Sequence, residues 1–118
     1  MNALVLDPAA STGFCLVTIK DNVATIFETG FIDAITSKSI YQGDHCISLM
    51  EKVEALIIKH NIEHIGIEDY FFSSKFTSGA NINIAYRTAI HITARKNNIP
   101  YTILNVSSWK KYIAGTTT

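Results

Sequence analysis

The sequence has few cysteines and no long hydrophobic run. Its two cysteines, Cys15 and Cys46, lie far apart in apolar surroundings and show no metal-ligand spacing. We therefore expect reduced thiols in the core of a cytoplasmic protein. No stretch approaches the ~20 apolar residues of a membrane helix, which argues against a membrane association. The first ten residues lack a basic region ahead of an apolar one, so a signal peptide is not expected.

The chain also lacks net charge, because ten basic residues balance ten acidic ones. This balance excludes an overall attraction to nucleic acid and leaves only local patches for such a contact. There are no internal repeats and no low-complexity segments. With 118 residues, of which 47% are hydrophobic, the chain can bury one core. We expect residues 1–118 to form a single domain.

Hydrophobic periodicity and turn residues predict an alternating α/β fold. Strands are expected at residues 2–7, 14–20, 23–32, 64–68 and 101–106, and helices at 45–60, 78–96 and 109–114. The order is βββαβαβα, with a loop over residues 33–44. The first three strands form a meander, whereas each later strand follows a helix and should run parallel to the first. The prediction is a mixed sheet of five strands with helices on its faces.

Two acids close strands that this topology can make neighbours. Asp7 ends the first strand and Glu68 ends the fourth. Ligands of such sheets collect at the carboxyl ends of adjacent parallel strands, and oxygen ligands suit Mg²⁺ or Mn²⁺. Side chains alternate along a strand, so Asp69 should point away from Glu68. The alternative at this point is structural: Asp7 bonds its own turn, and Glu68 is a solvated strand end.

The segment after Glu68 is rich in aromatic and hydroxyl side chains. Phe71 and Phe72 could stack on unpaired bases, at about 1–3 kcal/mol per base, or could be core or dimer contacts. Further side chains that could contact phosphates are Ser74, Lys75, Arg87, Lys110 and Lys111. Any single lysine among them could equally be a solvated surface residue.

Three segments together resemble the RuvC-type Holliday-junction resolvases. They are "LVLDPAASTGFCLV", "IGIEDYFF" and "IAYRTAIHITARKNNIPYTILNVSSWKKYIAG", in an order and spacing that cover nearly the whole chain. The resemblance implies a ribonuclease-H-like fold and a nuclease that cleaves four-way DNA junctions as a homodimer, in recombination and repair. It places Asp7 and Glu68 on the first two metal-binding acids of the family and Phe71 or Phe72 at a wedge position. The mechanism it implies is phosphodiester hydrolysis with two Mg²⁺ or Mn²⁺ ions per site, both held by Asp7 and one by Glu68.

The sequence departs from the family pattern in two places. Ala9 replaces the glycine that usually follows the proline, and the two acids that the family supplies from a C-terminal helix are not found. We therefore expect a truncated chain with an incomplete site, which could be inactive as it stands. Two other functions stay open. One is an actin-like or Hsp70-like ATPase half-domain, although the chain offers only one acid-plus-glycine turn. The other is a catalytically inactive, DNA-binding ribonuclease-H-like module.

Overall fold

A computed structural model of the chain describes residues 1–36, 39–69 and 78–105. It contains five strands and two helices in the predicted order. The strands are β1 (Asn2–Asp7), β2 (Ser11–Lys20), β3 (Val23–Asp33), β4 (Ile62–Asp69) and β5 (Tyr101–Asn105). The helices are α1 (Gln42–His60) and α2 (Ser78–Lys96). The helix predicted at 109–114 lies outside the described residues.

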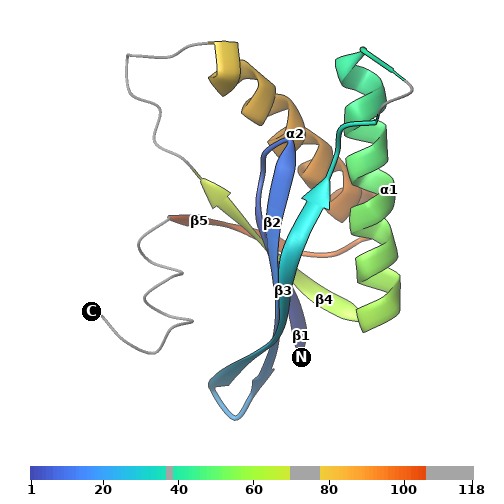
Figure 1. The fold of residues 1–118 in the computed structure, drawn as a ribbon. Helices are drawn as coiled ribbons and strands as arrows, with labels where there is room; N and C mark the ends of the chain where they lie inside the picture. The colour runs from blue at the N-terminus through green and yellow to red at the C-terminus, as the bar shows by residue number, and fades with distance from the viewer. Residues whose placement is uncertain (37–38, 70–77, 106–118) are drawn as a thin grey trace.

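The five strands form one mixed sheet in the order β3-β2-β1-β4-β5. β1 pairs antiparallel with β2, and β2 pairs antiparallel with β3. β4 runs parallel to both β1 and β5. The meander and the parallel direction of β4 were both predicted, because a strand that follows a crossover helix runs parallel to the first strand. That β1 and β4 are direct neighbours was left open by the sequence and is shown by the structure. Figure 1 labels the five strands, and their order makes β1 and β4 neighbours within the sheet.

Local sequence explains where these elements end. Asp21 and Asn22 both have positive φ, at 53° and 63°, which is the conformation of a tight hairpin turn between β2 and β3. Asn61 adopts φ 54° and ends α1 with its backbone N–H donating to the Ile57 carbonyl. α1 begins at Gln42, before the predicted start at residue 45. The sequence did not indicate this earlier start, because the N-cap residue Tyr41 makes no side-chain capping hydrogen bond.

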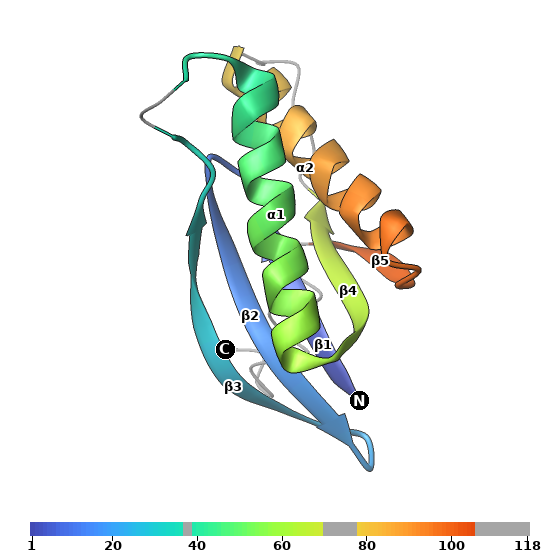
Figure 2. The same ribbon diagram turned by 90° about the vertical axis from the view of Figure 1, so that its right-hand side faces the viewer.

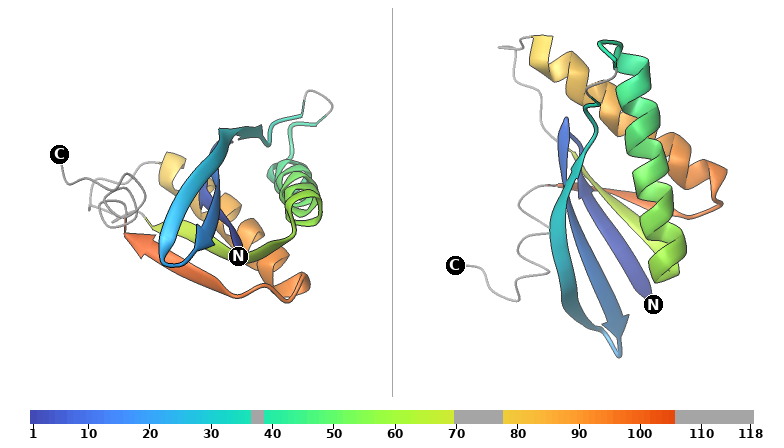
Figure 3. Two further views of the ribbon diagram at one scale, coloured as in Figure 1. Left: turned by 90° about the horizontal axis from the view of Figure 1, so that it is seen from below. Right: turned by 45° about the vertical axis from the view of Figure 1, so that its right-hand side comes forward.

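Both helices pack on the same face of the sheet, which Figure 2 and Figure 3 show from different directions. The core lies in this layer and is formed by alternate strand residues and by one stripe of each helix: Leu4, Leu6, Leu16, Ile65, Ile67, Leu49, Val53, Ile57, Tyr86, Ile90 and Ala94. On α1, the buried residues Leu49, Val53 and Ile57 are spaced four residues apart. On α2, Thr93 faces inward, whereas Ile92 is exposed. The other strand residues point to the face away from the helices, which is called the open face below.

Candidate active site

The structure brings Asp7 and Glu68 to the same corner of the open face. β1 and β4 are adjacent and parallel, with Leu6 opposite Ile67. Leu6 and Ile67 belong to the core under the helices. Since side chains alternate along a strand, the next residue of each strand, Asp7 and Glu68, points to the open face. The predicted convergence of these two acids at the carboxyl ends of β1 and β4 is therefore present.

The two acids differ in their exposure to water. Asp7 is half-buried at the end of β1, whereas Glu68 is only 2% exposed. A carboxylate that is withdrawn from water needs hydrogen-bond donors or a cation to compensate its charge. The alternative, in which Glu68 is a solvated strand end, is thus wrong, because an ordinary strand terminus would leave this carboxylate in water.

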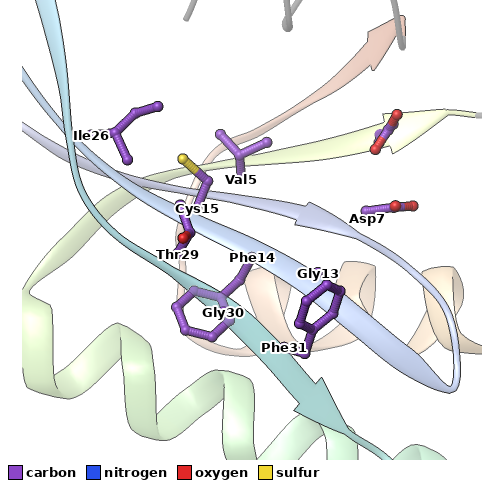
Figure 4. Close-up of a pocket in the computed structure, with 10 residues that line it drawn as sticks. Val5, Asp7, Gly13, Phe14, Cys15, Ile26, Thr29, Gly30 and Phe31 are labelled. Atoms are coloured by element: carbon purple, nitrogen blue, oxygen red, sulfur yellow. The ribbon is translucent and has the colours of Figure 1, made fainter. Parts of the chain in front are cut away.

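A cavity of about 420 Å³ lies next to the acids on the open face. Figure 4 shows Asp7 at its right-hand end, with strands β1, β2 and β3 forming its floor. Apart from Asp7 and Glu68, the lining is almost entirely apolar or small: Val5, Gly13, Phe14, Cys15, Ile26, Thr29, Gly30 and Phe31. The cavity therefore has one acidic end and one apolar end.

The turn that follows Asp7 is held by a buried hydroxyl. Thr12 is fully buried, accepts a hydrogen bond of 3.2 Å from the Ala9 N–H and donates one of 2.6 Å to the Ala9 carbonyl. The Ala34 N–H donates to the Ala10 carbonyl at 2.8 Å, which ties the turn to the end of β3. These bonds fix the backbone at the point where Asp7 leaves β1. Ala9 does not have positive φ, so the alanine in place of glycine causes no strain here.

The donor chemistry of Asp7 and Glu68 fits a divalent cation, since both provide carboxylate oxygens from rigid strands. Within the described part of the chain, no group of three or more His, Cys, Asp or Glu side chains is arranged to hold a metal ion. The described residues thus contribute two carboxylates to such a site and no third.

Most predicted DNA-contacting residues lie outside the described residues. These are Phe71, Phe72, Ser74, Lys75, Lys110 and Lys111. Arg87 is described: it lies half-buried on α2, in the helix layer, and does not line the cavity beside the acids. Its predicted contact with phosphate stays a prediction.

Sequence reasoning missed Phe31 and Cys15 as neighbours of the acids. Their signal is the alternation along β2 and β3, which is regular from Ser11 to Leu16 because the register shift lies beyond Leu16. Gly13 pairs with both Asp7 and Phe31, and Cys15 pairs with Thr29, so Cys15, Thr29 and Phe31 share the face of Asp7.

Neither of the two described helices, α1 and α2, has the length and the apolar character that a membrane-spanning helix needs.

Comparisons with known proteins place this arrangement in a class. The fold is ribonuclease-H-like, because it superposes on Thermus thermophilus RuvC in complex with a Holliday junction substrate with a TM-score of 0.77. That match has 13% sequence identity and covers 94% of this chain and 68% of the other. A second match is the Fowlpox virus resolvase in complex with Holliday junction DNA, with a TM-score of 0.56 and 14% identity, over 89% of this chain and 60% of the other.

The sequence itself identifies the family. Residues 3–118 match the family model described as crossover junction endodeoxyribonuclease RuvC, and the chain belongs to this family. The RuvC protein of Orientia tsutsugamushi (strain Boryong) is 29% identical over 116 residues, which are 98% of this chain and 71% of that protein. The RuvC protein of Treponema denticola is 30% identical over 81 residues, which are 68% of this chain and 44% of that protein. This membership favours a nuclease over the ATPase half-domain.

Proposed function

We propose that the protein cleaves four-way or otherwise branched DNA by hydrolysis of phosphodiester bonds, with Asp7 and Glu68 as the catalytic acids. The observation that carries this proposal is the convergence of the two carboxylates at one corner of the open face in a chain of the RuvC family. Thermus thermophilus RuvC and the Fowlpox virus resolvase, which share this fold, are described in complex with Holliday junctions. DNA recombination and repair are the processes in which such a cleavage is used.

Asp7 and Glu68 would hold divalent cations, Mg²⁺ or Mn²⁺, and the proposal assigns two ions to each site. Bound ions of this kind stabilise the negative charge that develops on the oxygens of a phosphodiester during hydrolysis. The protein's part is to keep two carboxylates on adjacent strands in one orientation. Burial of Glu68 limits its side-chain motion, and the hydrogen bonds of Thr12 restrain the backbone that follows Asp7.

A cleavage assay on synthetic four-way junctions tests this function. The full-length protein should cut the junction in the presence of Mg²⁺ or Mn²⁺. Asp7→Asn removes one charge at nearly constant volume and should abolish cleavage while junction binding, measured by a mobility shift, is retained. Cleavage by Asp7→Asn at the wild-type rate would overturn the assignment of Asp7. Junction binding without any cleavage by the wild-type protein would instead favour the inactive DNA-binding module.

We also propose that the protein acts as a homodimer, because two sites related by a two-fold axis would cut symmetric strands of a junction. An exposed stripe on α2 supports this proposal. Ile84, Thr88 and Ile92 are spaced four residues apart and are all exposed, so two large apolar side chains face away from the core. Ile92→Glu in the full-length protein should convert a dimer into a monomer in sedimentation analysis, and an unchanged mass would argue against this surface.

A further inference from the structure

An aromatic ring stands exposed beside the two acids. Phe31 on β3 is 78% exposed and lines the cavity that Asp7 and Glu68 also line. A phenylalanine at this exposure leaves most of its apolar surface in water, where it gains nothing for the stability of the described fold. Because Phe31 lies next to the two acids, its ring can contact the molecule that the acids bind.

The register of three strands aligns Phe31 with Asp7. Asp7 lies opposite Gly13, and Gly13 lies opposite Phe31. A Cβ atom built on Gly13 would be 3.7 Å from Asp7 Cβ and 3.7 Å from Phe31 Cε1. Gly13 therefore leaves a hollow between the carboxylate and the ring, and Figure 4 shows the three residues in a row across β1, β2 and β3. The φ of Gly13 is not in the left-handed region, so the glycine matters here for space rather than for backbone conformation.

We propose that Phe31 is a positioning residue for the DNA strand, contacting the nucleotide next to the phosphate that the acids address. This inference rests on the proposed function. The cavity has the volume range of small-molecule sites, an acidic end suited to a metal-bound phosphate, and an apolar end suited to a sugar or base. A flat ring stacks on any base, so the contact would add affinity without sequence preference.

The test compares three substitutions in the full-length protein. Phe31→Leu keeps apolar volume but removes the flat ring, whereas Phe31→Trp restores an aromatic face. Phe27→Leu is the matched control: Phe27 is on the same strand and 44% exposed, but its ring lies 5.7 Å from that of His60 on α1, on the helix side of the sheet. Each variant is assayed for KM and kcat on a synthetic four-way junction, for junction binding with Ca²⁺ in place of Mg²⁺, and for thermal stability.

Phe31→Leu should raise KM and weaken junction binding by about tenfold, with an unchanged melting temperature. Phe31→Trp should restore both values, and Phe27→Leu should match the wild type. A lowered melting temperature with unchanged KM and binding would show that the ring packs against another part of the full-length protein, and would overturn the inference. If the wild type does not cleave, the proposed function fails, and the binding experiment still decides the role of Phe31.

Discussion

The ring of Phe14 on β2 lies across Gly30 of β3, its register partner. A Cβ atom on Gly30 would be 2.8 Å from Phe14 Cε2 and 2.9 Å from Cζ. Distances of this kind are too short for real carbon atoms, and a phenyl ring has little freedom to move within a sheet. Gly30 therefore leaves the space that the ring of Phe14 occupies against the neighbouring strand, where this ring packs on the core under the helices.

Gly30→Ala should destabilise the fold because the new methyl group and the Phe14 ring compete for the same space. Overpacking typically costs about 1–3 kcal/mol in the free energy of unfolding, which urea denaturation can measure. Gly43→Ala is the control, since a Cβ on Gly43 of α1 meets nothing within 4 Å. This control should leave stability unchanged or raise it by up to about 1 kcal/mol. Equal stability of Gly30→Ala and the wild type would contradict the packing described here.

Thr12→Val should also destabilise the protein, because valine has the shape of threonine but cannot bond to Ala9. The substitution removes both hydrogen bonds between Thr12 and Ala9 and leaves the Ala9 N–H without its acceptor. The expected loss is about 1–3 kcal/mol in the free energy of unfolding. Thr12→Ser keeps the hydroxyl and should retain most of this stability. If the valine and serine variants unfold at the same denaturant concentration, the hydroxyl does not hold the turn.

Glu68→Gln should weaken divalent-ion binding more than it disturbs the fold. The change removes a charge at constant size from a nearly buried position. We expect the half-saturating Mn²⁺ concentration for junction cleavage to rise at least about tenfold and kcat to fall about 100-fold or more. In the Asp7→Asn background, Glu68→Gln should cost much less Mn²⁺ affinity, measured by calorimetry, than it costs in the wild type, because the two acids hold the same ions. Additive losses would indicate that the carboxylates work at separate sites.

Cys15 should make the protein less stable at alkaline pH. Burial raises the pKa of its thiol above the ordinary value of 9.0. The unfolded thiol then loses its proton at a lower pH than the folded one, so the free energy of unfolding falls as pH rises past 9.0. Below that pH the contribution is fully present. Cys15→Ala should show a shallower decline between pH 8 and 10.5, apart from a constant offset from its smaller volume. Parallel curves for the two proteins would contradict this role.

The sequence indicated the architecture and singled out both acids, although it left open whether their two strands are neighbours. Unbroken apolar runs ending in Asp7 and Glu68 marked the strands, and the helix between them required a parallel crossover. These features are all determined by local patterns or by strong topological rules.

Other features depend on contacts that no local pattern records. The register shift between Leu16 and Val17 lies between the hairpin turn and Phe31. Counting the alternation of β3 from that turn would therefore place Phe31 on the wrong face, so its position beside Asp7 could not be predicted from the sequence. The early start of α1 was hidden because Gly43 in the first turn argues against a helix and Tyr41 provides no side-chain cap. The burial of Glu68 depends on how the strands assemble rather than on its own segment.

The parallel pairing of β1 with β4 also determines when, during folding, the two acids come together. Asp7 and Glu68 come from opposite halves of the chain, because β1 and β4 are neighbours in the sheet but are separated in sequence by β2, β3 and α1. Contacts of such long sequence separation form late and slowly during folding. A nascent or partly unfolded chain therefore has no assembled pair of acids, and it would remain harmless to DNA until its sheet is complete.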